Sequence, residues 1–339
     1  MFQRILVPLD GSSRAERALP VAAQLARASH GSVLLMEVVS PPIDYGGALA
    51  QTALLTEQAI ETGIEEATSY LQSVAQSATL AGIETKIEVL FGLVAQGILD
   101  VAQSRRADLI VMCSHGRTGF KRLVLGSVAQ KIVHHSPVPV LVLREGGAVL
   151  SVSGSAPVRP LCILVPLDGS PLAETALAPA ANLVAALAAP AERALHLTHV
   201  IKEYSLAAEE DVISKLNKEA LEHAKVYLLA LKERLQENFK DFKLSITWSI
   251  ALDSAVADRI VCTAERGERI VRTEGYSGCD LIAMSTHGRG GLERLMMGSV
   301  TEGVLNATKL PILIVPPQRC SAGTGKRVHG ETRQKEIEQ

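Results

Sequence analysis

Glycine and serine residues recur at two places in the chain with the same spacing. Residues 115–127 read HGRTGFKRLVLGS, and residues 287–299 read HGRGGLERLMMGS. Because glycine has no Cβ, backbone N–H groups can approach an anion there, and the start of a helix supplies further N–H donors. The candidate phosphate cradles are Gly116, Gly126 and Ser127 in the first stretch and Gly288, Gly298 and Ser299 in the second.

Plainer interpretations of these stretches stay open. Glycines also turn the chain, and Ser127 and Ser299 can simply cap helices. The arginines beside the cradles can contact phosphates or only water: Arg117, Arg122, Arg289 and Arg294. His115 and His287 lack a paired carboxylate or metal-ligand spacing, so we interpret them as loop-packing residues.

An aspartate follows the first apolar run of each half in the sequence VPLDGS, as Asp10 and as Asp168. In an open parallel sheet, ligands bind beyond the carboxyl ends of the strands, where the strand order reverses. A carboxylate there can accept hydrogen bonds from a ribose hydroxyl or an adenine amine. The competing interpretation is an Asx turn before a helix.

The standard nucleophile, metalloprotease and Walker motifs are missing from the sequence. G-x-S-x-G, H-E-x-x-H and G-x-x-x-x-G-K-[ST] do not occur. We therefore expect no catalytic residue and no enzyme, with slow ATP hydrolysis as an open alternative.

Composition excludes several classes of protein. The 339 residues fit two domains, 34 Lys and Arg balance 36 Asp and Glu, and aromatics are only 3%, so we expect no nucleic-acid partner. Five scattered cysteines suggest neither a disulfide framework nor a zinc site, and indicate a reducing cytoplasm. The alanine-rich run 176–191 contains Asn182 and is predicted to be a buried helix ended by Pro190, so no membrane span is expected.

The chain is an internal repeat. RILVPLDGSSRAERAL at 4–19 returns as CILVPLDGSPLAETAL at 162–177, and ADLIVMCSHG returns as CDLIAMSTHG after an insertion at 265–278. The order of matched segments is kept, which indicates duplication of a whole domain. We predict domains at 1–144 and 160–317, a linker at 145–159 and a disordered tail at 318–339.

Each half alternates short apolar runs with segments of helical period. The runs RILVPL, SVLLMEVV, TKIEVLF, DLIVM and VPVLVL suit strands of a parallel sheet covered on both faces. Ser13 and Glu16 are predicted to form a capping box, and Ser170 to cap a helix that starts at Pro171. The fold class is therefore α/β, with two tandem doubly wound domains of about five strands.

These segments together resemble the universal stress protein family, over about 1–144 and 160–317. The residues that carry the resemblance are VPLDGS, a second run ending in VV or HVI, and SHGRTGFKRLVLGSV before PVPVLVLR. The resemblance implies a five-stranded parallel sheet of order 3-2-1-4-5 with helices on both faces. It also implies ATP binding through the motif G-x-x-G-x9-G-[ST].

Carried over position by position, the resemblance implies a nucleotide site in each half. Aspartate and valine would hold ribose and adenine, and the glycine loop would hold the phosphates. The chain departs from the motif at its first glycine, which is Cys113 in one half and Ser285 in the other. The implied residues are Pro8, Asp10, Val38, Cys113, Gly116, Gly126, Ser127 and Val128 in the first half, and Pro166, Asp168, Val200, Ser285, Gly288, Gly298, Ser299 and Val300 in the second.

The leading hypothesis is a cytoplasmic ATP-binding regulator of the stress response, with Mg²⁺ or Mn²⁺ recruited through the phosphates. The alternative is an interaction module of the same fold without nucleotide, for which Cys113 and Ser285 argue. The runs VPVLVL and LPILIV are apolar enough to pair the two halves as an internal pseudo-dimer, and a homodimer and a protein partner are further expectations.

Overall fold

Helices and strands alternate along both halves of the chain, as the sequence predicts. The computed structural model describes residues 2–40, 51–115, 125–144, 160–188, 192–203, 210–267, 272–273, 278–286 and 297–317. The predicted linker at 145–159 and the predicted tail at 318–339 fall outside these residues.

The first half contains strands that coincide closely with its apolar runs. These strands are β1 (Arg4–Leu9), β2 (Ser32–Val39), β3 (Glu84–Phe91), β4 (Leu109–Cys113) and β5 (Val140–Leu143). The helices between them are α1 (Ser13–Glu16), α2 (Ala18–Ser29), α3 (Gln51–Ala75), the short 3₁₀ helix η1 (Ala78–Leu80), α4 (Val94–Ser104) and α5 (Ser127–His135).

The second half repeats this order and adds one short strand. Its strands are β6 (Leu161–Pro166), β7 (Arg193–Ile201), β8 (Leu244–Leu252), β9 (Arg272–Thr273), β10 (Leu281–Ser285) and β11 (Ile312–Val315). Its helices are α6 (Pro171–Glu174), α7 (Leu177–Leu187), α8 (Glu210–Asn238), the 3₁₀ helix η2 (Lys240–Phe242), α9 (Val256–Arg266) and α10 (Ser299–Ala307).

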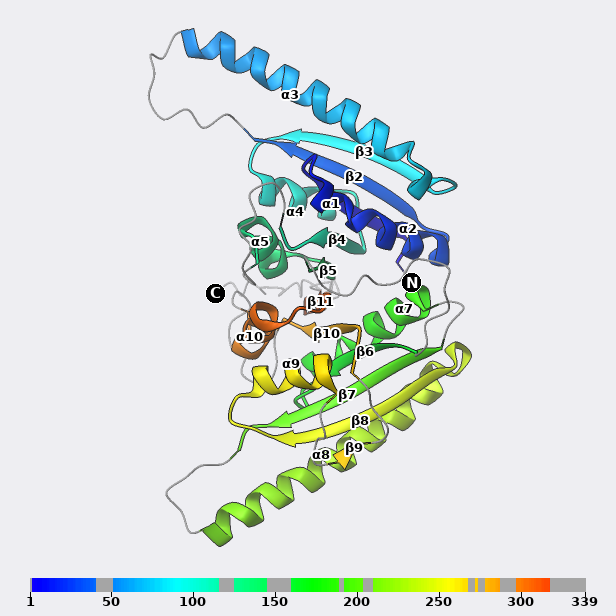
Figure 1. Cartoon of the computed structure of the whole chain (residues 1–339), viewed down its shortest axis with the longest axis vertical. Coiled ribbons are helices and arrows are strands. Elements are labelled where there is room, and N and C mark those ends of the chain that lie inside the picture. The colour runs from blue at the N-terminus through cyan, green and yellow to red at the C-terminus, as the bar shows by residue number, and fades with distance from the viewer. Residues whose placement is uncertain are drawn as a thin grey trace, which may run out of the picture.

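All described strands belong to one sheet of 11 strands, in the order β3-β2-β1-β4-β5-β11-β10-β6-β7-β8-β9. Within each half the order is 3-2-1-4-5 and the pairing of these five strands is parallel, which confirms the predicted fold class. The halves meet where β5 pairs antiparallel with β11, through Leu141 opposite Leu313 (Figure 1). The expected pairing of the two final strands within the chain is therefore present.

The added strand β9 comes from the insertion at 265–278. It pairs antiparallel with β8, through Thr273 opposite Ser249, so it extends the outer edge of the second half. Strands β7 and β8 separate it from β6.

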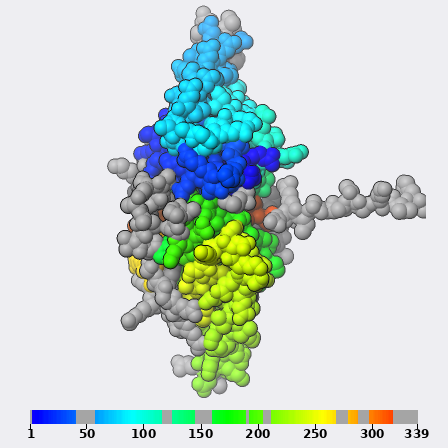
Figure 2. Space-filling model, turned by 90° about the vertical axis from the view of Figure 1, so that its right-hand side faces the viewer, coloured from blue at the N-terminus to red at the C-terminus, as the bar shows by residue number. Residues whose placement is uncertain are grey.

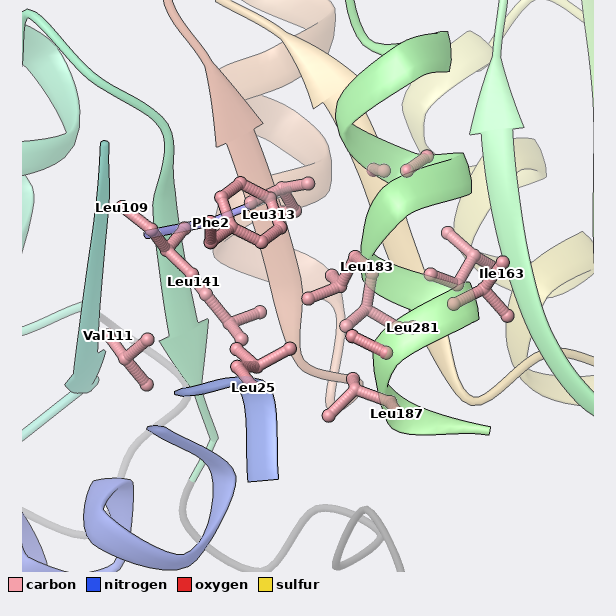
Figure 3. Packing of buried hydrophobic residues seen from close by; sticks show 14 of the residues in the cluster. Phe2, Leu25, Leu109, Val111, Leu141, Ile163, Leu183, Leu187, Leu281 and Leu313 are labelled. Atoms are coloured by element: carbon pink, nitrogen blue, oxygen red, sulfur yellow. The ribbon is translucent and has the colours of Figure 1, made fainter. Parts of the chain in front are cut away.

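The two faces of the sheet carry two hydrophobic cores, and each core includes residues of both halves. One face is covered by α1, α2, α3, α6, α7 and α8, and the other by α4, α5, α9 and α10. At the joint, Leu25 and Leu183 come from helices of different halves and pack beside Leu141 and Leu313 (Figure 3). The sequence suggested one core per domain, whereas continuation of the sheet through β5 and β11 merges them.

The long helices α3 and α8 lie at opposite ends of the molecule (Figure 1), and the turned view in Figure 2 shows the same two ends. The alanine-rich run forms the buried helix α7, which ends at Leu187, while Pro190 lies outside the described residues. Within the described parts of the chain, every helix is too short or too polar to cross a membrane.

The capping box predicted at Ser13 and Glu16 is wrong by one residue. Ser12 is the N-cap of α1, because it is extended and its Oγ accepts a hydrogen bond from the Ala15 N–H at 3.2 Å. The prediction for the second half is confirmed, since the Ser170 Oγ accepts a hydrogen bond from the Ala173 N–H at 3.1 Å.

Candidate functional site

The loops that follow β1 and β4 open at the same edge of the sheet. These strands are neighbours, paired through Ile5 opposite Leu109, but the chain leaves them toward opposite sides of the sheet, to β2 and to β5. This reversal is the switch point at which open α/β sheets bind ligands. In the second half, β6 and β10 form the equivalent point, paired through Ile163 opposite Leu281.

Strand register brings the predicted residues of three strands to one level. Leu9 lies opposite Glu37 in the β1–β2 ladder, so the next residues along, Asp10 and Val38, come level at the carboxyl edge. The β1–β4 ladder places Leu6 opposite Ile110, which by the same count brings Ser114 level with Asp10.

The second half repeats this arrangement. Pro166 lies opposite Thr198 in the β6–β7 ladder, so Asp168 and Val200 come level. Leu164 lies opposite Ile282, which brings Thr286 level with Asp168. The two halves therefore present the same set of positions, each at the carboxyl ends of its own strands.

Each aspartate forms the Asx turn that was its competing interpretation. The Asp10 Oδ1 accepts hydrogen bonds from the Ser12 N–H at 3.1 Å and from the Ser12 hydroxyl at 2.6 Å. The Asp168 Oδ1 accepts one from the Ser170 N–H at 2.9 Å. Gly11 has a φ of 76°, which favours glycine at this turn. The turn fixes each carboxylate at the end of its strand.

Gly126 and Gly298 close the base of each glycine loop. The Gly126 N–H donates to the Ser114 carbonyl at 2.9 Å, and the Gly298 N–H donates to the Thr286 carbonyl at 2.8 Å. A Cβ at Gly126 would lie 2.9 Å from the Ser114 carbonyl oxygen, closer than real Cβ contacts allow. This glycine therefore has a structural reason as well as a candidate binding role.

The same glycines are the N-caps of α5 and α10, and neither helix has a side-chain cap. Ser127 and Ser299 are the exposed first residues of these helices, followed by Val128 and Val300. The interpretation that these serines are N-caps is therefore wrong, because the N-cap position belongs to glycine. The first-turn N–H groups, with the partial positive charge of a helix start, suit an anion.

The side chains that replace the first motif glycine are both accommodated at the strand ends. The Cys113 Sγ lies 3.8 Å from the Ala15 carbonyl oxygen of α1, and the Cys113 side chain packs against the core beneath α1 and α2. Ser285 is buried, and its carbonyl accepts a hydrogen bond from the Thr301 hydroxyl at 3.0 Å.

Some of the remaining predicted residues lie at the site, and the others fall outside the described residues. Val38 and Val200 pack against the core on the α4 and α9 face. Pro8 lies opposite Met36 in the β1–β2 ladder, at the same end of the strand. The positions outside the described residues are Gly116, Arg117, Arg122, His287, Gly288, Arg289 and Arg294.

Sequence reasoning missed a tyrosine beside each site. The Tyr70 hydroxyl in α3 donates to the Glu16 carboxylate at 3.0 Å, and the Tyr227 hydroxyl in α8 donates to Glu174 at 3.0 Å. Burial, and then the hydrogen bond to glutamate, raises the pKa of both tyrosines well above the usual range. A signal was available, because each tyrosine follows its glutamate by nearly the same interval, 54 and 53 positions.

Charged residues at each candidate site also affect the pKa of the neighbouring tyrosine. The negative charges of Glu37 and Asp10 contribute to raising the pKa of Tyr70, and that of Asp168 contributes for Tyr227. In the second half His199 lies at the strand position of Glu37, and its ring meets the edge of Tyr227 with 6.1 Å between centroids. The two sites therefore differ in local charge.

Among the residues that the structure describes, no group of three or more His, Cys, Asp or Glu side chains is close enough to hold a metal ion.

The fold and this edge define a class: a duplicated doubly wound α/β protein with a candidate ligand site at the switch point of each half. A family model described as the universal stress protein family matches residues 1–144 and 162–316. The chain belongs to the universal stress protein family, as a tandem of two copies.

Individual relatives agree with this assignment. A universal stress protein of Mycolicibacterium smegmatis is 24% identical over 317 residues, which cover 93% of this chain and 97% of that protein. One from Thermus aquaticus is 35% identical over 145 residues, 42% of this chain and 100% of that protein. The crystal structure of a universal stress protein from Archaeoglobus fulgidus has a TM-score of 0.59 and 20% identity, covering 93% of this chain and 96% of that one, and supports the fold.

Proposed function

We propose that the chain is an ATP-binding regulatory protein of the stress response, with one nucleotide site in each half and no enzymatic role. One observation carries the proposal: strand register sets Asp10 and Val38 level at the switch point, where the N-cap of α5 is a glycine. The second half repeats this with Asp168, Val200 and Gly298. Ribose and adenine fit the strand ends, and phosphates fit the helix starts.

In this proposal Mg²⁺ or Mn²⁺ is held through the phosphates. The described side chains form no acidic cage, and Mg²⁺ commonly binds through substrate phosphates with few protein ligands. The protein works in the cytoplasm without nucleic acid or membrane partners, and nucleotide occupancy selects a protein partner or a homodimer.

A direct experiment is to denature freshly purified protein and identify any released nucleotide by chromatography, then to measure ATP binding to the emptied protein by calorimetry. We expect two sites per chain. Protein that carries no nucleotide and gives no heat with ATP would contradict the proposal and favour an interaction module without nucleotide.

The position of Cys113 supports that second candidate, because its thiol occupies space that a motif glycine would leave open beside Ala15. A single-turnover assay tests the third candidate, a slow ATPase. ADP that accumulates over hours with bound ATP would support slow hydrolysis, and ATP recovered intact would support the binding role.

Substitutions that add a negative charge at one helix start test which site accounts for each ATP-binding event. Ser127→Asp and Ser299→Asp each put a carboxylate at an exposed helix start, which tolerates negative charge but repels phosphate. Each variant should lose one of the two binding events. Gln103→Glu is the matched control, because Gln103 is exposed near the end of α4, at the opposite edge of the sheet, and should leave both events unchanged.

A further inference from the structure

Two cysteines that are 117 positions apart in the sequence lie in contact in the second half. Cys162 is the second residue of β6, and Cys279 lies two residues before β10. Their Sγ atoms are 3.0 Å apart, which is longer than an S–S bond of about 2.0 Å, so the structure holds two thiols. No sequence pattern predicts that these two cysteines meet.

Hydrogen bonds of the backbone, one of them to the Asp280 carboxylate, hold both positions in place. The Cys162 N–H donates to the Asp280 Oδ2 at 2.9 Å, and the Asp280 N–H donates to the Cys162 carbonyl at 2.8 Å. The Cys279 N–H donates to the Ala264 carbonyl at 2.7 Å. Adjacent strands lie about 4.8 Å apart, and a disulfide spans Cα atoms about 4.4–6.8 Å apart, so the strand spacing suits a bridge.

The cysteines are not needed to build this part of the fold. The first half has Arg4 and Ala107 at the corresponding places, as the aligned repeats show. It keeps the same backbone frame: the Arg4 N–H donates to the Asp108 Oδ1 at 3.1 Å, and the Asp108 N–H donates to the Arg4 carbonyl at 2.9 Å. The thiol pair is a property of the second copy alone.

The pair lies at the rim of the core. Cys162 is 6% exposed and Cys279 is 4% exposed, whereas Ile163 and Leu281, one and two residues further along, are 0% exposed. Cys162 comes shortly after the segment that joins the halves, and Cys279 comes directly after the insertion. Both cysteines therefore keep a small exposed fraction, unlike the core residues that follow them.

We propose that Cys162 and Cys279 are an oxidation site, at which hydrogen peroxide or another hydroperoxide converts the two thiols into an intrachain disulfide. One thiolate attacks the peroxide, which breaks the O–O bond and gives a sulfenic acid and one water, or one alcohol where the oxidant is an alkyl hydroperoxide. The second thiol then displaces the sulfenic hydroxyl as a second water and forms the S–S bond. Two electrons pass from the thiols to the peroxide, and a dithiol reductant returns them.

The bridge joins the start of β6 to the residue two before β10, at the opposite edge of the sheet from Asp168 and Thr286. It closes a long loop, which restricts the unfolded chain. In a reducing compartment such a bridge forms only under oxidant, as transient redox-sensing disulfides do. This inference is independent of nucleotide binding.

The experiment uses the full-length reduced protein and one equivalent of hydrogen peroxide. Thiol titration after denaturation should fall from the five cysteines of the sequence to three, and dithiothreitol should restore all five. Peptide mapping after alkylation should recover Cys162 and Cys279 in one cross-linked pair. The midpoint of thermal unfolding should rise by on the order of 5 °C.

Variants supply the controls. Cys162→Ser and Cys279→Ser should each abolish the cross-linked peptide pair, while Cys262→Ser, which removes a half-buried thiol of α9, should still form it. If a variant fails to fold, the wild-type peptide map decides, since it needs no substitution. Recovery of Cys162 and Cys279 as separate alkylated or over-oxidised peptides would overturn the proposal, as would bridges found only between chains.

Discussion

The hydroxyl of Tyr70 donates a hydrogen bond of 3.0 Å to the carboxylate of Glu16, and so fastens the end of α1 to the long helix α3. Helix α1 begins at the Asx turn of Asp10, so this contact supports the loop that carries the aspartate. Tyr227 and Glu174 make the same contact in the second half.

Tyr70→Phe should lower the free energy of unfolding by about 1–3 kcal/mol, because it removes a hydrogen bond to a charged group. Urea denaturation at neutral pH measures the change. Glu16→Gln is the matched control, since it keeps an acceptor oxygen and should cost less. A Tyr70→Phe protein as stable as the wild type would show that the contact is dispensable.

The two tyrosines should resist alkaline titration. Their pKa values are raised in the folded protein, so each hydroxyl holds its proton more tightly there than in the unfolded chain. The resulting stability is fully present below the unfolded pKa of about 10 and is lost as the pH rises through that value toward the folded one. Absorbance at 295 nm should show two of the five tyrosines titrating late, and Tyr70→Phe with Tyr227→Phe should remove them.

His196 should make the second half sensitive to acid. Its ring is fully buried on the sheet between the hydroxyls of Thr247 and Ser249, each at 2.8 Å, and burial lowers its pKa to about 3. The folded protein therefore favours the neutral ring, and this stability is present above an unfolded pKa of about 6.5 and is lost as the pH falls below it.

Chemical denaturation at several pH values between 7 and 4 tests this. His196→Leu should flatten the dependence, because Leu34 occupies the same place in the first half, although the substitution costs stability at pH 7 by leaving Thr247 without its partner ring. An unchanged slope in this variant would assign the acid sensitivity to other groups.

Unfolding of the two halves should be coupled. Leu141 is 0% exposed in a core shared by both halves, and Leu141→Ala should cost about 2–5 kcal/mol. Trp248, the only tryptophan of the sequence, reports on the second half. Its fluorescence transition should therefore shift with a substitution made in the first half. A tryptophan transition that stays in place would mean that the halves unfold separately.

Gly126→Ala should lower stability whether or not nucleotide is present, by about 1–3 kcal/mol, because its new Cβ would strike the Ser114 carbonyl. Thermal unfolding of nucleotide-free protein measures this. Gly97→Ala is the milder comparison, since its Cβ would lie 3.2 Å from a side-chain methyl of Val38. Equal stability of Gly126→Ala and the wild type would contradict the predicted clash.

The sequence predicted most strands well because they are short apolar runs, and the central ones are buried on both faces, as Ile5, Leu6 and Val7 show with 0% exposure each. The two-residue strand β9 is not such a run and was not predicted. The sequence also predicted the duplication of the whole domain. The order of the strands could be predicted only from the family resemblance, because the apolar runs do not indicate which strands pair. The N-cap was displaced by one residue, since Ser12 and Ser13 offer the same hydroxyl and only backbone geometry separates them.

Other features depend on contacts that no local pattern encodes. The shared cores arise from the antiparallel pairing of β5 with β11, and the contact of Cys162 with Cys279 arises from strand register across 117 positions. For the site, strand register brings the aspartates and valines level in each half, while the role of each in binding stays a prediction.

The presence of two copies in one chain, with β5 paired to β11, has an evolutionary consequence. In a symmetric homodimer every substitution appears twice, so both sites must change together. Here one gene specifies the two halves separately, and a change in one leaves the other intact. Two such one-sided changes are His199, which stands where the first half has Glu37, and Cys162, which stands where the first half has Arg4.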